Sequence, residues 1–540
     1  MVGNHQLGSE ATHGMNTNTE IVFVLLLVIM LVGLLLSFFM YAGPNPRYDD
    51  TTYLNQAGLL MGLNPTFILN RFTYGYLSIL PIAISFYLFG IGAGQAILPS
   101  IVEFEFIILI AFVVGKKVGG NDLAILSAFL VATFPFLVGY STRVMIDITL
   151  GAAASLAVYL LTLAYYGKES KKFDFLVGAF ATLPIYIKTE GILFLVITAA
   201  YLVFLMFASI LNKPTANKKK KEGFTSIQTR YILLGMLLGF VIYLLPFYFV
   251  SHNLFFIFNF YSISPARAPH VDALATVILP FIYNSSNLDL FSLGIAPLLA
   301  LFGTILAFRK KKGQLLYIAS VNWFIILYFI FGSSSLSSYI PIPLVSRLFG
   351  IIALPLAIMA AYSILEIYQI LSHKIKKNFR VLYFAIVIAV IMSGYLHTYG
   401  TIKIDNLIVS NFTEAYSNTF SYINSTKTQT NMSVYIQAQR GFRLSSIYFM
   451  DFLSAYRSGY HFRIVNYSYS EFGSKTCLIN NKTQYYLLNI YDPQLNSSML
   501  DAQNTTITKW IGNNCTVVPL TEFNPQDHAI IIYIYKLEKK

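Results

Sequence analysis

Two adjacent carboxylates, Asp49 and Asp50, follow the first apolar run of the chain. The residues after them, Thr51 to Ala57, are typical of the capped start of a helix lying along a membrane surface. In a structural interpretation, one carboxylate accepts hydrogen bonds from the first-turn N–H groups. In a chemical interpretation, the paired carboxylates activate a nucleophile or hold a divalent cation. The local sequence is compatible with both.

Further charged residues stand at the ends of apolar segments: Arg71, Arg143 with Asp147, Lys188 with Glu190, and Arg347. On one helix, the spacing of Arg143 and Asp147 would place them on the same face, where they can pair. Snorkelling or a structural salt bridge explains each group taken alone. Together at one membrane surface, they would suit an anionic substrate carried by a lipid, with the cations neutralising a phosphate. For Glu103 and Glu105, which have no basic residue nearby in the sequence, we expect a structural or interfacial role.

The elements that position these residues are long apolar segments. Hydrophobic residues make up 56% of the 540-residue chain and charged residues 11%, against about a quarter charged in soluble domains. Apolar runs long enough to cross about 30 Å of hydrocarbon recur from Ile21 almost to His397. We therefore expect an all-α polytopic membrane bundle, because a spanning segment must satisfy its own backbone hydrogen bonds.

The basic residues fix the expected topology. Twelve apolar segments are predicted, at 21–41, 73–91, 97–114, 123–139, 145–166, 173–187, 190–211, 231–250, 291–308, 314–332, 348–371 and 381–397. The net charge of the chain is +13, and its lysines and arginines cluster in short loops at 116–117, 168–172, 213–221, 309–312 and 374–380. This is the positive-inside pattern of membrane proteins and does not indicate a nucleic-acid partner. All five loops can be cytosolic together, which places residues 398–540 outside.

One segment conflicts with a simple count of crossings. If the acidic loop 42–72 is outside and Lys116 is inside, an odd number of crossings must separate them. Two apolar segments, 73–91 and 97–114, lie between them instead. Either segment 73–91 does not cross fully, or the N-terminus is outside and loop 42–72 is cytosolic. In the first case the chain has about eleven crossings, one re-entrant or interfacial helix, and a cytosolic tail at 1–20.

Residues 398–540 are predicted to form an extracytoplasmic domain of α/β or mainly β type. Alternating runs at 485–491 and 529–537 favour strands. Nine N-x-Ser/Thr sequons lie in loops predicted outside, where they can be glycosylated: Asn284, Asn411, Asn424, Asn431, Asn466, Asn481, Asn496, Asn504 and Asn514. The two cysteines of the chain, Cys477 and Cys515, lie in this domain, and in an oxidising compartment we expect them to form a disulfide.

The charged turns resemble those of the polyprenyl-phosphate-sugar glycosyltransferases of the GT-C fold, especially the protein O-mannosyltransferase and aminoarabinose-transferase branch. The resemblance covers about residues 20–370 and rests on Asp49-Asp50-Thr51-Thr52-Tyr53, Ala57, Gly62-Leu63-Asn64-Pro65, Arg71, Leu88-Phe89-Gly90, Ser141-Thr142-Arg143 with Asp147, Lys188-Thr189-Glu190 and Ser346-Arg347-Leu348. The chain departs from the family pattern at Asp50, where glutamate is usual, and at Leu348, where tyrosine is usual.

The resemblance implies catalytic roles for Asp49 and Asp50, with Asp49 as the base that activates the acceptor. If the site uses a divalent metal ion as cofactor, Asp49 and Asp147 are its expected ligands. Substrate-binding roles are expected for Tyr53, Arg71, Arg143, Asp147, Lys188, Glu190 and Arg347. The family's acidic loop lies outside the cytosol, which favours a segment 73–91 that enters the membrane without crossing it.

The function implied is transfer of a sugar, with inversion, from a polyprenyl or dolichyl phosphate to a protein, lipid or glycan acceptor on the outer face of the cell membrane. A transporter or flippase of lipid-linked sugars is the main alternative, although transporters usually show internal repeats and polar groups near the midplane. A membrane anchor for the outer domain needs fewer spans. The oligosaccharyltransferase branch needs a Trp-Trp-Asp-Tyr-Gly motif, and the chain has two separate tryptophans, Trp323 and Trp510.

Overall fold

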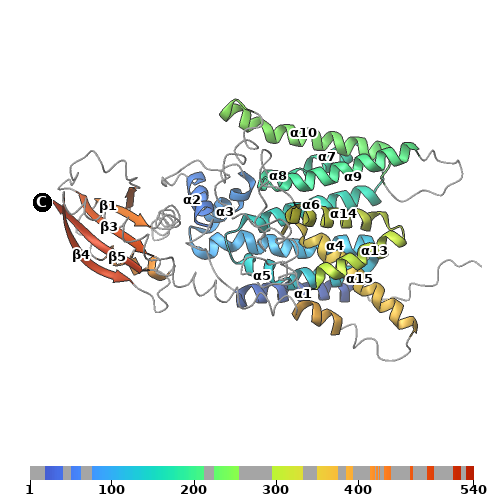
Figure 1. Ribbon diagram of the computed structural model, residues 1–540, viewed down its shortest axis with the longest axis horizontal. Coiled ribbons are helices and arrows are strands. Elements are labelled where there is room, and N and C mark those ends of the chain that lie inside the picture. The colour runs from blue at the N-terminus through green and yellow to red at the C-terminus, as the bar shows by residue number, and fades with distance from the viewer. Residues whose placement is uncertain are drawn as a thin grey trace, which may run out of the picture.

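The computed structural model describes most of the helical region and five strands of the C-terminal region (Figure 1). The described residues are 19–40, 50–61, 76–168, 170–211, 224–253, 295–331, 350–374, 385–392, 414–416, 418–419, 421–423, 425, 431–438, 462–465, 483–491, 515–523 and 531–539. Every structural statement below concerns these residues.

The apolar segments form a helical bundle. Its helices are α1 (Thr19–Phe39), α2 (Asp50–Leu60), α3 (Tyr76–Phe89), α4 (Ala93–Thr133), α5 (Pro135–Ser141), α6 (Ile146–Tyr166), α7 (Lys171–Phe180), α8 (Leu183–Ile187), α9 (Gly191–Leu211), α10 (Ser226–Ser251), α13 (Ala296–Arg309), α14 (Gly313–Phe331) and α15 (Ala353–Lys374). Within the described residues, five helices are long and apolar enough to span a membrane, and four shorter helices are apolar. The chain is therefore an integral membrane protein. Eleven crossings remain a prediction.

The helices divide into a buried centre and a periphery that is open to lipid. In an 18-residue apolar stretch within residues 350–372, which contain most of α15, 89% of the residues are buried inside the protein, against 28% in the corresponding stretch of α1. The side chains of α1 that stay exposed are aliphatic or aromatic, such as Phe23 and Leu35. Their exposure is expected for a helix that faces hydrocarbon, because lipid tails solvate apolar side chains.

Two predicted segments join into one hairpin. The predicted segment 97–114 and most of 123–139 lie on the two arms of α4, which reverses at Gly120, where φ is 85°. A Cβ atom at Gly115 would lie 2.8 Å from the Cα atom of Ala124, so the two arms touch directly at the turn. Glycine is needed at both positions, for the positive φ of one and the close approach of the other. After α4, residues 135–141 form the separate short helix α5.

The predicted segment 173–187 is divided into α7 and α8. Ala181 ends α7, and Pro184 stands in the first turn of α8, where its missing N–H does no harm. The predicted segment 73–91 becomes α3, whose 14 residues span only about 21 Å at 1.5 Å per residue. Residues 62–75, directly before α3, lie outside the described residues, and whether this segment crosses the membrane stays a prediction.

The described strands of the C-terminal region form one five-stranded sheet. The strands are β1 (Asn431–Ala438), β2 (Phe462–Val465), β3 (Thr483–Tyr491), β4 (Cys515–Phe523) and β5 (Ile531–Lys539). Their order is β2-β1-β3-β5-β4, with β1 parallel to β2 and β3, and β5 antiparallel to β3 and β4. The sheet lies beyond the end of the bundle that carries α2 and α3 (Figure 1). Strands β3 and β5 match the two alternating runs, while the α/β or mainly β character of the whole region stays a prediction.

Candidate functional site

The start of α2 is enclosed by protein. Asp50 and Thr51 are fully buried, and Tyr53 is 2% exposed, so α2 is not a helix lying freely on a membrane surface. Oδ2 of Asp50 accepts a hydrogen bond from the backbone N–H of Val144 at 3.0 Å. This bond links the acidic pair to the connection between α5 and α6, which is 94 residues further along the chain.

The connection between α5 and α6 also holds the end of α1. The hydroxyl of Thr142 donates to the carbonyl oxygen of Met40 at 3.5 Å, and the hydroxyl of Ser141 donates to that of Ser37 at 2.7 Å. Residues 41–49, which contain Asp49, are not among the described residues. Both flanks of this acidic segment are nevertheless bonded to the same four residues, 141–144.

Arg143 does not share a helix with Asp147, so the predicted pairing by helical spacing is wrong. Helix α5 ends at Ser141 and α6 begins at Ile146, which leaves a non-helical link between them. Arg143 is 3% exposed, and its guanidinium carbon lies 5.4 Å from the ring centroid of Tyr140, within cation–π range.

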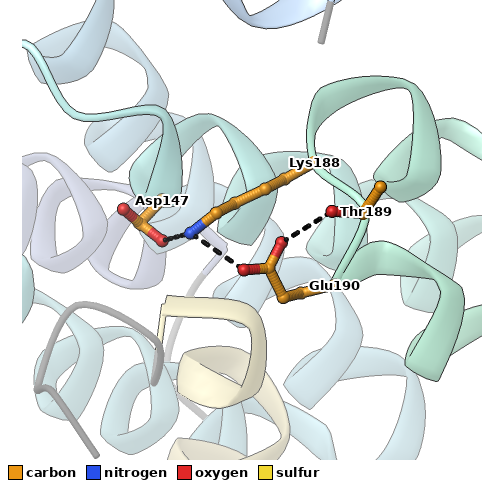
Figure 2. Close-up of polar contacts among 4 residues, drawn as sticks. All are labelled: Asp147, Lys188, Thr189 and Glu190. Atoms are coloured by element: carbon orange, nitrogen blue, oxygen red, sulfur yellow. Dashed lines mark hydrogen bonds and ion pairs between the residues drawn. The ribbon is translucent and has the colours of Figure 1, made fainter. Parts of the chain in front are cut away.

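A charged cluster joins the start of α6 to the turn between α8 and α9 (Figure 2). Nζ of Lys188 lies 2.8 Å from Oδ1 of Asp147 and 3.4 Å from Oε1 of Glu190. The hydroxyl of Thr189 donates to the other carboxylate oxygen of Glu190 at 3.3 Å. The side chain of Asp147 is 4% exposed, that of Lys188 15% and that of Glu190 32%, so the cluster opens on the Glu190 side.

Main-chain packing holds this cluster in place. A Cβ atom at Gly191, directly after the turn, would lie 2.2 Å from the backbone of Pro184, so only glycine fits. A Cβ atom at Gly350 would lie 2.7 Å from the carbonyl oxygen of Asp147. The described segment that begins at residue 350 therefore packs directly against the start of α6, three residues after Arg347, which itself lies outside the described residues.

Sequence reasoning missed one contact beside the cluster. The hydroxyl of Thr149, two residues after Asp147, donates to Oε2 of Glu103 on α4 at 2.7 Å. The sequence shows no basic residue near Glu103, and a threonine 46 residues away gives no local signal of a contact. Both oxygens of Glu105 are buried and have no hydrogen-bond partner within the described part of the chain.

The predicted site residues fall into two sets. The structure brings together Asp50 with the link after α5, and Asp147 with Lys188 and Glu190. Tyr53, on α2, and Arg143, in the link after α5, are described and buried, and the charged cluster does not include them. A second set lies outside the described residues: Asp49, Arg71, Arg347, Cys477, Asn284, Asn411, Asn424, Asn466, Asn481, Asn496, Asn504 and Asn514. Asn431 begins β1 and Cys515 begins β4. No cluster of three or more potential metal ligands occurs within the described ranges, and since Asp49 is outside them, the proposed metal site is untested.

Comparisons with known proteins found one matching family model and several solved structures with a similar fold. The family model for dolichyl-phosphate-mannose-protein mannosyltransferase matches residues 76–218, which include Asp147 and Lys188. No curated protein sequence matches the chain. Among solved structures, apo ArnT from Cupriavidus metallidurans aligns with 96% of this chain and 98% of its own at a TM-score of 0.60 and 12% identity.

Two ligand-bound structures are similar as well. ArnT from the same organism bound to undecaprenyl phosphate has a TM-score of 0.55, 12% identity and the same coverage of both chains. The oligosaccharyltransferase AglB from Archaeoglobus fulgidus, in complex with an inhibitory peptide and a dolichol-phosphate, has a TM-score of 0.53 and 12% identity. That alignment covers 95% of this chain and 74% of AglB.

These similarities define the class of protein: a membrane protein with the GT-C fold. The resemblance to the polyprenyl-phosphate-sugar glycosyltransferases of that fold, carried in the sequence by its charged turns, is confirmed by the family match and by ArnT and AglB.

Proposed function

We propose that this protein is a membrane glycosyltransferase that moves a sugar from a polyprenyl or dolichyl phosphate carrier to an acceptor on the outer face of the cell membrane. One observation carries the proposal: the segment with Asp49 is bonded at both flanks to residues 141–144, which lead directly into Asp147. The carriers named for ArnT and AglB, undecaprenyl phosphate and dolichol-phosphate, support a lipid phosphate as the donor.

The carboxylates take different roles in this mechanism. Asp49 removes the proton from an acceptor hydroxyl as its oxygen attacks the anomeric carbon of the sugar. The bond from that carbon to the phosphate oxygen breaks, and the lipid phosphate leaves with the electron pair. Asp50 is a positioning residue, because its bond to Val144 fixes the main chain only one Cα–Cα step, about 3.8 Å, from Asp49.

The charged cluster receives the donor phosphate through Lys188. One ammonium between two carboxylates leaves a net negative charge, which repels a phosphate. The contact to Glu190 is the longer and the more exposed of the two. When a phosphate oxygen replaces Glu190 at Nζ, Asp147 keeps Lys188 in place, but the ammonium still faces two anions, so the donor phosphate needs other cations as well. Arg71 and Arg347 supply further positive charge to the leaving group.

The catalytic assignment is tested with Asp49→Asn, which keeps the size of the side chain and removes the base. In membranes supplied with a polyprenyl-phosphate sugar, we expect transfer to fall by at least about 10²-fold, the usual contribution of a general base. The matched control is Asp122→Asn, an exposed carboxylate at the α4 hairpin, which should leave transfer unchanged. Full activity of Asp49→Asn would refute the assignment.

The flippase alternative gives a different result in the same variants. Purified protein in liposomes would move lipid-linked sugars between leaflets without any acceptor, and Asp49→Asn would not change that rate. We expect no such movement.

The topology and the cofactor need separate tests. Glycosylation of Asn431 or Asn504 in the native host would place the C-terminal domain outside, and an unmodified, cytosol-accessible domain would refute the eleven-crossing arrangement. Metal ions stripped with a chelator and restored one at a time would reveal whether the transfer depends on Asp49 and Asp147 as metal ligands.

A further inference from the structure

Helices α7 and α10 pack against each other with almost no side chains between them. A Cβ atom at Gly178 would lie 1.9 Å from the carbonyl oxygen of Ile232, and one at Gly235 would lie 2.0 Å from that of Phe175. A Cβ atom at Gly239, four residues after Gly235, would lie 2.4 Å from the hydroxyl oxygen of Thr182. Small residues at this spacing are typical of closely packed helices in membranes. Helix α10 lies at the edge of the bundle with α7 beside it (Figure 1).

An open groove of about 430 Å³ lies where this helix pair begins, lined by Lys171, Lys172, Phe175, Leu176 and Tyr231. Two of these five side chains are cations and none is an anion. Nζ of Lys171 lies 5.8 Å from the ring centroid of Tyr231, so one ammonium already sits over an aromatic face.

Two carboxylates flank the lysines in the sequence: Glu169, which lies outside the described residues, and Asp174, which does not reach the surface of the groove. Asp174 is fully buried, and one of its oxygens accepts a hydrogen bond from the backbone N–H of Ser170 at 3.3 Å, before the first turn of α7. Among the described side chains that line the groove, the charged ones are therefore both cations.

The groove lies at the opposite end of the bundle from the charged cluster. Helix α6 has 21 residues, so about 31 Å separates its start, beside Asp147, from its end. Lys171 follows that end by five residues. Helices α7 and α8 then return the chain to Lys188, which contacts Asp147.

Apolar side chains continue from the groove along the outside of both helices. Leu176 is 52% exposed, Phe180 46% and Leu234 52%. Cations at the end of a pair of membrane helices, followed by an exposed apolar strip, match the shape of a phospholipid, with the phosphate at the lysines and a hydrocarbon chain along the helices.

We propose that this groove binds one anionic phospholipid of the leaflet opposite the charged cluster, with its phosphate between Lys171 and Lys172 and its first acyl carbons against Leu176. Charge complementarity and the continuous apolar strip favour a lipid over a free phosphate, because a free anion would leave the apolar lining in contact with water. The site is independent of the glycosyl-transfer mechanism.

The test measures lipid binding to the purified full-length protein by native mass spectrometry, with dioleoylphosphatidylglycerol as the anionic probe and dioleoylphosphatidylcholine as the neutral one. We expect one phosphatidylglycerol to bind at least fivefold more tightly than phosphatidylcholine, since each lysine near an anionic headgroup contributes about fivefold. The preference should weaken as salt rises. Excess glycerol phosphate should not displace the lipid. Equal affinity for the two lipids, or displacement by glycerol phosphate, would overturn the proposal.

The double variant Lys171→Gln/Lys172→Gln should lose the preference for phosphatidylglycerol. The matched control, Lys116→Gln/Lys117→Gln, removes two exposed lysines from another basic turn, and Lys116 likewise lies over an aromatic ring, that of Phe112 at 5.9 Å. This control should keep the preference for phosphatidylglycerol. An equal loss of that preference in both double variants would show that it comes from general surface charge and would overturn the proposal.

A third variant, Leu176→Gln, tests the apolar half of the groove without changing any charge. It should weaken binding of both lipids and keep their ratio. Unchanged binding of both would show that no hydrocarbon chain lies in the groove. Because all of the substituted side chains are exposed, the variants should unfold at the same temperature as the wild-type protein. Thermal unfolding is measured on the same samples.

Discussion

Removing the cation from the Asp147–Lys188 pair should destabilise the fold more than removing either carboxylate. Lys188→Met keeps the apolar stem but leaves Asp147, which is 4% exposed, without the ammonium at 2.8 Å. Breaking a buried pair from one side costs about 3–5 kcal/mol. Since the side chain of Lys188 is 15% exposed, water can reach the site, and we expect a loss near about 3 kcal/mol in the free energy of unfolding.

The reverse variant should cost less. Asp147→Asn leaves Lys188 with Glu190 at 3.4 Å on the more exposed side, so the loss should be about 1–2 kcal/mol. The double variant removes both buried charges, and its loss should fall below the sum of the single losses by about 2 kcal/mol, which is the coupling between the two residues.

The assay is unfolding by SDS in mixed micelles, followed by the loss of helical circular dichroism. Lys312→Met serves as a control, because Lys312 is exposed and has no ion pair within the described residues; it should change the free energy by less than about 0.5 kcal/mol. Strictly additive losses in the double variant would mean that the pair is not coupled and would refute the reasoning.

Three further variants test contacts around the site. Asp50→Ala should cost about 1–3 kcal/mol of unfolding free energy, because the buried N–H of Val144 loses its acceptor; Asp50→Asn, which keeps an oxygen there, should restore most of it, and equal losses would contradict this. Gly178→Leu should destabilise by roughly 3 kcal/mol in the same assay, since even its Cβ meets the carbonyl of Ile232. Thr149→Val removes the hydroxyl that donates to the carboxylate on α4 and should cost about 1–2 kcal/mol, with wild-type unfolding as the contrary result.

The apolar segments could be predicted from the sequence because each depends on local composition. The predicted span 21–41 corresponds to α1, and 190–211 to α9. The turn of the α4 hairpin falls in the gap between the predicted segments 97–114 and 123–139. Which glycine makes the turn could not be predicted, since a glycine with positive φ and a glycine at a close contact look alike in sequence. The division of segment 173–187 has a visible signal in Pro184, because proline is favoured in the first turn of a helix.

The predicted pairing of Arg143 with Asp147 failed for a tertiary reason. Residues 142–145 contain neither glycine nor proline, so the local sequence does not indicate that the helix breaks there. The break is held from outside, by the bonds of Thr142 to Met40 and of Val144 to Asp50. Helical spacing predicts a contact only where the helix is continuous. Here, bonds to segments distant in the sequence interrupt the helix.

The geometry of the charged cluster is set by the main chain rather than by the charges. Gly191 fits its turn against Pro184, and Gly350 fits against the carbonyl of Asp147, at distances that exclude any side chain. The first contact fixes the turn after α8 and the second fixes the start of α6 against the segment at residue 350, so each side of the cluster is held by main-chain packing even if Lys188 is neutral. Charge-removing substitutions should therefore shift stability by a few kcal/mol and leave the fold intact. It follows that a loss of sugar transfer in these variants would report on the chemistry of the site and not on its collapse.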